Sequence, residues 1–202
     1  MSELGVFLGG EGPNELGSRS GDAPYQTDAV PGVLQALLRL VQPAGWRVVG
    51  AKNWAQIRKL KARGPSPNEA QNVRALALDA KEAGAAILAF IRDSDGHDER
   101  IQDIDTGIAQ AKRSDPDLEL IGGVAHPVLE AWLLAMQGER GTERLSKSAA
   151  QASYGVKTGA LKNTEKAVEI VEACVPQSVP QDARTLHGWL NTASEVFARR
   201  IR

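Results

Sequence analysis

The sequence predicts an α/β fold of the Rossmann-like kind, with a mainly parallel sheet flanked by helices and a helical extension at the C-terminus. Short apolar runs alternate with longer segments in which apolar residues recur every three or four positions. This alternation is typical of parallel strands joined by helical crossovers. After Gly138 the strand pattern stops and only helical spacing continues, which predicts that the remaining helices pack on the same domain.

Apolar runs that end in glycine or in acidic residues predict the strands. The predicted strands cover residues 4–10, 46–51, 86–91 and 118–125. The third run is the most apolar of them and stops at two aspartates, Asp93 and Asp95. The fourth is weakened by a glycine pair, Gly122 and Gly123. About four strands are therefore expected, which is an ordinary number for one sheet.

Helical spacing of apolar residues predicts the crossovers. Residues 11–22 are rich in Gly, Ser, Asn and Pro, and we expect them to form a loop. Asn68 can cap a helix that ends near Gly84, and Pro127 suits the first turn of another. The other predicted helices cover residues 30–41, 98–113, 143–154, 164–174 and 186–197.

Length and composition indicate an ordinary globular chain. Its 202 residues are 42% hydrophobic and 24% charged, so a complete core can form. We expect an α/β domain at 1–137 and a helical extension at 138–202. The one cysteine, Cys174, excludes an internal disulfide and fits a reducing compartment. No apolar segment approaches the roughly 20 residues that span a bilayer, and we expect a cytoplasmic protein with no membrane association.

Acidic residues follow three of the predicted strands. Glu11 and Glu15 come after the first, Asp93 and Asp95 after the third, and Glu130 after the fourth. In a parallel sheet the carboxyl ends of the strands share one edge, where ligands bind. Hard cations such as Mg²⁺ take oxygen ligands, including carboxylates. The sequence therefore predicts a site for Mg²⁺ or Mn²⁺ at this edge, with Glu11, Asp93, Asp95 and Glu130 as ligands.

Each acid also has a simpler explanation. Glu11 and Glu15 could be solvated loop residues, and the two aspartates could form a turn before the next helix. Glu130 near a helix N-terminus gains from the helix dipole without any function. Other motifs are absent: the glycine-rich loop at 9–17 lacks the ending of a P-loop, and the histidines show no zinc spacing. His126 precedes Glu130 by four residues and could assist at the site, although a structural role is the simpler interpretation.

A basic segment at 47–63 contains no acidic residue. It would follow a phosphate backbone well, with Trp54 available for base stacking, or it could be a solvated helix face. The residues that we expect to contact nucleic acid are Lys52, Arg58, Lys59, Lys61 and Arg63.

The order of these motifs resembles the Toprim domain. EGPNE follows one predicted strand, DSD follows another, and HPVLEAWLL opens a later helix. The match covers residues 5–137 and is similar to small bacterial Toprim-like proteins of uncharacterised function and to the Toprim nuclease half of the OLD family. The resemblance implies a magnesium-dependent site in which Glu11 is a general acid or base or a metal ligand. Glu15, Asp93, Asp95 and Glu130 match the other acids of the motif.

The chain also departs from that family. Topoisomerases need a tyrosine nucleophile in a separate domain, and neither Tyr25 nor Tyr154 has such a context. OLD proteins carry an ATPase domain, and this chain has none. The resemblance therefore implies a nuclease that acts alone or with a partner ATPase, for example in phage defence.

These observations lead to one leading hypothesis and two alternatives. The leading hypothesis is a metal-dependent phosphodiesterase that acts on DNA or RNA, with Glu11, Glu15, Asp93, Asp95 and Glu130 as the catalytic residues. The first alternative is a non-catalytic module that binds nucleic acid or docks a regulatory partner. The second is hydrolysis of a small phosphorylated metabolite.

Overall fold

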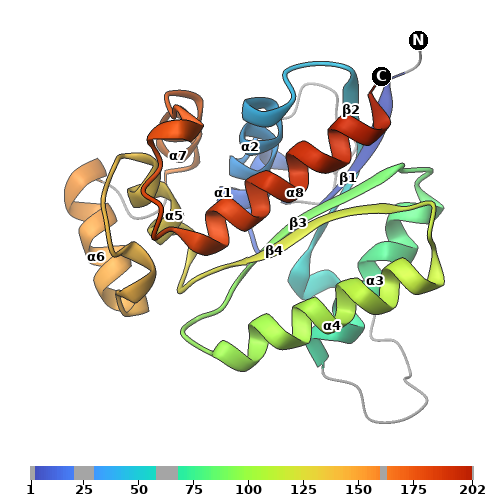
Figure 1. The fold of residues 1–202 in the computed structure, drawn as a ribbon, viewed down its shortest axis with the longest axis horizontal. Helices are drawn as coiled ribbons and strands as arrows, with labels where there is room; N and C mark the ends of the chain where they lie inside the picture. The colour runs from blue at the N-terminus through green and yellow to red at the C-terminus, as the bar shows by residue number, and fades with distance from the viewer. Residues whose placement is uncertain (1–2, 21–29, 58–67, 160–162, 202) are drawn as a thin grey trace.

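The computed structural model describes residues 3–20, 30–57, 68–159 and 163–201 (Figure 1). Its centre is a four-stranded sheet in the order β2-β1-β3-β4, and every neighbouring pair is parallel. The strands are β1 (Leu4–Gly10), β2 (Trp46–Asn53), β3 (Ile87–Asp93) and β4 (Glu119–Ala125). The predicted α/β class and parallel sheet are confirmed, and each predicted strand agrees with the observed one to within two residues at either end.

Helices flank the sheet and follow it along the chain. They are α1 (Pro13–Leu16), α2 (Val33–Val41), α3 (Asn68–Glu82), α4 (Asp98–Ser114), α5 (Leu129–Met136), α6 (Lys147–Thr158), α7 (Thr164–Glu172) and α8 (Arg184–Arg200). Short 3-10 turns lie at η1 (Gly17–Ser20), η2 (Trp54–Gln56), η3 (Thr142–Arg144) and η4 (Pro176–Ser178). No helix in the described ranges is both long enough and apolar enough to cross a membrane.

The two faces of the sheet are covered by different helices. Figure 1 shows α3 and α4 on one face and α2 and α8 on the other. The alternation of strand side chains produces this division: Leu88 and Phe90 pack with α3 and α4, whereas Ile87, Ala89 and Ile91 pack into the larger core on the other face. Residues of α5, α7 and α8 belong to that larger core, so the C-terminal helices share it with the sheet.

The glycine pair of β4 makes room for two aromatic rings. A Cβ atom on Gly122 would lie 2.2 Å from Cε1 of Phe90, and one on Gly123 would lie 3.1 Å from Cδ1 of Trp189. The Trp189 indole N–H also donates a hydrogen bond to the Phe90 carbonyl at 3.1 Å, which ties α8 to the sheet. The glycines that weaken the strand pattern in the sequence therefore allow close packing.

Several elements differ from the sequence prediction, and three of the differences lie near the N-terminal ends of helices. The expected loop at 11–22 contains α1 and η1, because Pro13 occupies a first-turn position that suits its fixed φ. The helix expected from Pro127 begins at Leu129. The helix expected at 143–154 begins at Lys147, since the Ser146 side chain caps it by accepting the Ala149 N–H at 3.2 Å.

Candidate functional site

Four of the five predicted acids gather at the carboxyl edge of the sheet. Glu11 directly follows β1 and Asp93 ends β3, the neighbouring central strand. Glu11 Oε1 accepts a hydrogen bond from the Asp93 backbone N–H at 2.8 Å. Glu15 comes from α1 and Glu130 from the first turn of α5, and the charges of both act on Asp93. Segments separated by more than eighty residues thus place Glu11 against Asp93.

The turn after β1 buries Glu15. Its Oε2 accepts the Gly12 backbone N–H at 2.8 Å, one turn back along α1. Gly10 permits this approach, since a Cβ atom there would lie 2.6 Å from the Glu15 Cβ. Burial is the main cause that raises the pKa of Glu15 to about 7, and the charges of Glu11 and Glu130 add to it. An ionised Glu15 is therefore disfavoured unless a positive charge comes close.

Asp93 is the most perturbed acid of the group. Its Oδ1 accepts the Leu129 backbone N–H at 2.8 Å and so caps α5, which explains why that helix begins two residues after Pro127. Burial, then the charges of Glu11, Glu15 and Glu130, raise its pKa to about 9, against the opposing effect of the Leu129 N–H. Burial also raises the pKa of Glu130. At neutral pH the nearby positive charges are therefore too few to keep all four carboxyl groups ionised.

Asp95 behaves differently from the other four. Its backbone is left-handed, with φ of 54°. Its carboxylate accepts hydrogen bonds from Arg100 Nη1 at 2.7 Å and from Lys147 Nζ at 2.6 Å. Partial burial opposes its ionisation, but the bonds from Lys147 and Arg100 outweigh burial and lower its pKa. The structure therefore gives Asp95 two basic partners instead of placing it among the buried acids.

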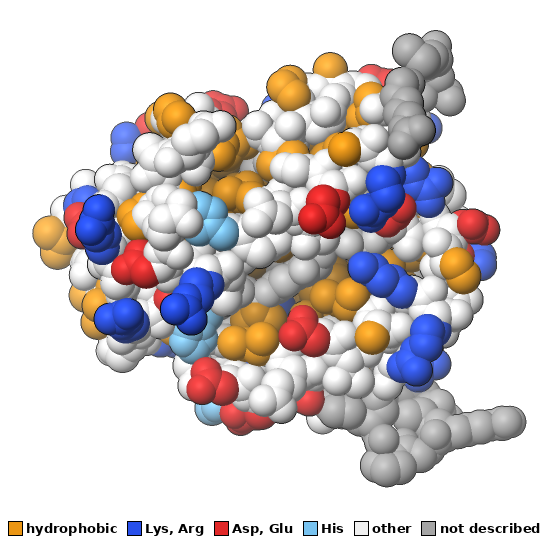
Figure 2. All heavy atoms as spheres, viewed as in Figure 1, with side chains coloured by type: hydrophobic (Ala, Val, Ile, Leu, Met, Phe, Trp, Pro, Cys, Tyr) orange, Lys and Arg blue, Asp and Glu red, His pale blue; other side chains and the backbone are white. Residues whose placement is uncertain are grey.

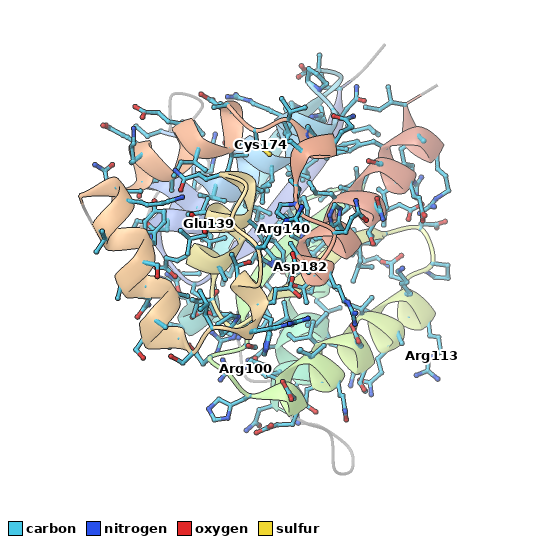
Figure 3. All side chains as sticks on the ribbon, turned by 60° about the vertical axis from the view of Figure 1, so that its left-hand side comes forward. Arg100, Arg113, Glu139, Arg140, Cys174 and Asp182 are labelled. Carbon is cyan, nitrogen blue, oxygen red and sulfur yellow. The ribbon has the colours of Figure 1, made fainter. Side chains whose placement is uncertain are left out.

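Basic side chains surround the acidic group, and sequence reasoning missed them. Arg92 forms an ion pair with Glu11 and donates to Glu69 Oε1 from Nη2 at 3.1 Å. Burial lowers the pKa of Arg92, but Glu11 and Glu69 outweigh it and raise the pKa overall. Arg100 lies at the start of α4, at the opposite end of the helix from Arg113 (Figure 3). A signal existed for Arg92, which directly precedes Asp93 in the sequence.

Lys147 brings the helical extension to the site. It is the first residue of α6. The hydrogen bond to Asp95 raises its pKa, burial opposes this, and the charges of Asp95, Asp93 and Glu11 add to the increase. The Lys147 amine is therefore close enough to interact electrostatically with acids at the ends of both β1 and β3. Nothing in the local sequence separates Lys147 from other exposed lysines.

His126 has a structural contact. Its Nδ1 lies 2.8 Å from the Ser94 hydroxyl, which is fully buried. The same hydroxyl donates to the Pro127 carbonyl at 3.2 Å. Ser94 and His126 therefore join the turn after β3 to the turn after β4 and help to position Asp93.

The predicted nucleic-acid contacts lie mostly beyond the described part of the chain. Arg58, Lys59, Lys61 and Arg63 are outside the described residues. Lys52 Nζ lies 3.5 Å from Asp79 Oδ2 in an ion pair. On the face in Figure 2, Lys and Arg side chains are scattered, with no single basic patch among the residues described there.

The donor set fits a hard cation, although its present arrangement does not enclose one. Glu11, Glu15, Asp93 and Glu130 offer the oxygen ligands that Mg²⁺ and Mn²⁺ take. Burial first, and then neighbouring acids, raise the pKa values of Glu15, Asp93 and Glu130, so a positive charge there would favour their ionised forms. Within the described ranges, no group of three or more His, Cys, Asp or Glu side chains is arranged to hold a metal ion. Arg92 already occupies one side of Glu11.

Comparisons with known proteins add no relative. No protein-family model matches the chain, and neither the curated proteins nor the solved structures give a significant match.

Proposed function

We propose that the chain is a metal-dependent phosphodiesterase that cleaves DNA or RNA at the group formed by Glu11, Glu15, Asp93 and Glu130. The observation that carries the proposal is the position of Asp93. Burial first, and then the charges of three other acids, raise the pKa of this carboxyl to about 9. Keeping four acids together with too few positive charges costs stability, and a site retained at that cost is typical of function. The sequence resemblance to Toprim nucleases supports the same chemistry.

Glu11, Asp93 and Glu130 would hold a divalent cation, Mg²⁺ or Mn²⁺. When bound, such an ion polarises a phosphoryl oxygen and lowers the pKa of water. The backbone N–H of Asp93 holds Glu11 in position, and the Leu129 N–H does the same for Asp93. Second-shell bonds of this kind orient ligands.

Other residues would act on the substrate and its protons. Glu15 keeps Oε2 on the Gly12 N–H, which leaves Oε1 to accept or donate a proton as a general acid or base. Lys147 and Arg100 place positive charge beside the acids, where it attracts a phosphate group. By analogy with OLD proteins, a partner ATPase and a role in phage defence belong to the same proposal.

A cleavage assay tests the proposal. Single- and double-stranded DNA and RNA are incubated with the protein in Mg²⁺ or Mn²⁺, with and without a chelator. We expect cleavage that the chelator stops, and a loss of roughly a hundredfold or more for Asp93→Asn. Asp117→Asn, an exposed aspartate remote from the site, is the matched control and should cleave normally. Cleavage that persists in the chelator would contradict the proposal.

One observation favours a second candidate function. Glu11 is already neutralised by Arg92, and the described residues hold no preformed metal group. A non-catalytic module that binds nucleic acid or docks a partner would need no metal there. That module predicts normal nucleic-acid binding by Glu11→Gln and no turnover by the wild type on any of the four substrates.

A further inference from the structure

Arg92 is shared between two acids that belong to different parts of the fold. Its Nη1 forms an ion pair with Glu11 Oε1 at the acidic site. Its Nε and Nη2 donate to Glu69 Oε1 on α3 at 3.3 and 3.1 Å. The Arg92 side chain is 13% exposed and that of Glu69 is 16% exposed, whereas that of Glu11 is 30% exposed. The Glu69 contact is therefore better shielded from water than the Glu11 contact. Arg92 therefore bridges the site to α3.

Glu69 is a fixed receptor for Arg92. Its Oε2 accepts the Trp54 indole N–H at 2.9 Å and the Asn72 amide at 3.3 Å. Arg100 Nε lies 3.2 Å from its Oε1. The Arg92 guanidinium also lies 5.4 Å from the centre of the Trp54 ring, within cation–π range. If Arg92 released Glu11, Glu69 and Trp54 would still hold it.

A divalent cation and Arg92 compete for the same carboxylate. Glu11 contacts both Arg92 and the acidic group, because it pairs with the Arg92 guanidinium and also accepts the Asp93 backbone N–H. An ion with two charges neutralises neighbouring carboxylates better than one shared guanidinium. Two cations that bind one oxygen also repel each other.

We infer that Arg92 is the resident cation of the acidic site, and that an entering divalent cation displaces it from Glu11 onto Glu69 and Trp54. This inference rests on the proposed function, because it concerns metal entry to the same site. It assigns Arg92 a regulatory role: the ion pair keeps the acids together when metal is scarce and sets the metal concentration at which the site fills. Glu69 is the positioning residue that receives Arg92.

Metal binding measures the competition directly. Mn²⁺ is titrated calorimetrically into the wild type, Arg92→Gln, Glu69→Gln and the double variant at pH 8. We expect Arg92→Gln to bind Mn²⁺ roughly tenfold more tightly, a change of about 1.4 kcal/mol. Glu69→Gln should bind several-fold more weakly when Arg92 is present, and this loss should disappear in the double variant. Arg199→Gln, which removes an arginine paired with Glu119 at 2.9 Å, should match the wild type.

Trp54 gives a second measurement that needs no change at Arg92. Mg²⁺ does not itself quench tryptophan, so a change in emission on adding Mg²⁺ reports movement near the ring. We expect such a change in the wild type and its loss in Trp54→Phe. This readout keeps the inference testable if Arg92→Gln does not fold.

The outcomes separate the inference from the proposed function. Binding of Mn²⁺ by the wild type but not by Glu11→Gln would support the metal site. If, in that case, Arg92→Gln binds Mn²⁺ no more tightly than the wild type, the displacement is wrong. The displacement is also wrong if Glu69→Gln loses the same affinity with and without Arg92. An absent Trp54 signal in metal-binding wild type also contradicts the displacement. If neither the wild type nor any variant binds Mn²⁺, both the displacement and the proposed function are wrong.

Discussion

The Glu11 carboxylate accepts the backbone N–H of Asp93 at 2.8 Å, across the carboxyl ends of the two central strands. This bond places a carboxylate that follows β1 beside a carboxyl that ends β3. Burial of Asp93, followed by the charges of Glu11, Glu15 and Glu130, raises the pKa of Asp93. Arg92, Arg100 and Lys147 supply the positive charges around this group of acids.

The metal-free protein should lose stability as the pH rises. The pKa of Asp93 increases on folding from 3.8 to about 9, and that of Glu15 from 4.5 to about 7. The folded state therefore binds more protons than the unfolded state between these values. The stability from both groups is complete below their ordinary pKa values and is lost as the pH passes through the folded ones. Urea unfolding in chelator between pH 5 and pH 9 measures this loss, and a flat profile would contradict it.

Asp93→Asn should stabilise the metal-free protein at pH 8. Asparagine keeps an oxygen that can accept the Leu129 N–H and needs no proton. Burial and the charges of Glu11, Glu15 and Glu130 instead make folded Asp93 take up a proton at pH 8, which costs stability. We expect a gain of at least about 1 kcal/mol, or roughly 2–4 °C in Tm for a chain of this size. Differential scanning calorimetry with chelator checks it, and Asp117→Asn should leave Tm unchanged. A lower Tm for Asp93→Asn would show that its carboxylate is stabilising as an ion.

Divalent cations should stabilise the protein more at pH 8 than at pH 5. Binding must displace the protons that the raised pKa values of Asp93 and Glu15 retain, so metal affinity increases with pH. An ion at about a hundred times its Kd adds about 2.7 kcal/mol. Thermal unfolding with Mn²⁺ or with chelator measures the gain. Glu11→Gln should lose most of it, whereas Glu172→Gln, an exposed glutamate on α7, should keep it.

Asp93 and Asp95 should contribute unequally, although the sequence presents them as an equivalent pair. Asp93 lies among the acids, while Asp95 is bound to Arg100 and Lys147. Asp93→Asn should remove cleavage, whereas Asp95→Asn should lower it roughly tenfold by releasing two side chains from their positions. Steady-state cleavage rates of the two variants decide this. Equal losses would show that Asp95 is itself a ligand.

Gly10→Ala should destabilise the fold at the site. Its Cβ atom would lie 2.6 Å from the Glu15 Cβ, so α1 must shift, at a cost of about 1–3 kcal/mol. Gly188→Ala is the matched control, because no atom lies within 4 Å of its added Cβ. Gly188 is inside α8, where alanine should stabilise by about 0.8–1.0 kcal/mol. Chemical unfolding of the two variants should give changes of opposite sign, and a neutral Gly10→Ala would contradict the close approach.

The sheet could be predicted because its signal is local. Apolar runs such as 86–91 are buried on both faces of the parallel sheet, and their ends were visible as glycine or aspartate. The same logic placed Glu11, Asp93 and Glu130 at one edge. Helix starts were less certain because distant groups set them: α5 begins where Asp93 accepts the Leu129 N–H, thirty-six residues later in the chain.

The basic partners of the site could not be predicted in the same way. Arg100 and Lys147 lie on two different helices, α4 and α6, and meet Asp95 only through tertiary packing. Their positions in the sequence follow no periodic spacing that would indicate a shared contact. In the sequence, Asp95 is only the second aspartate of a DxD pair. Its contacts with Arg100 and Lys147, which distinguish it from Asp93, become visible only in the fold.

The most direct test of the account is the rate of phosphodiester cleavage in Mn²⁺, compared among wild type, Glu11→Gln, Asp93→Asn and the control Glu172→Gln. The substrates are the same single- and double-stranded DNA and RNA. We expect the wild type and Glu172→Gln to cleave, with chelator abolishing the activity, and Glu11→Gln and Asp93→Asn to cleave almost nothing. Equal cleavage by Asp93→Asn and wild type, or no cleavage of any substrate by the wild type, would contradict it.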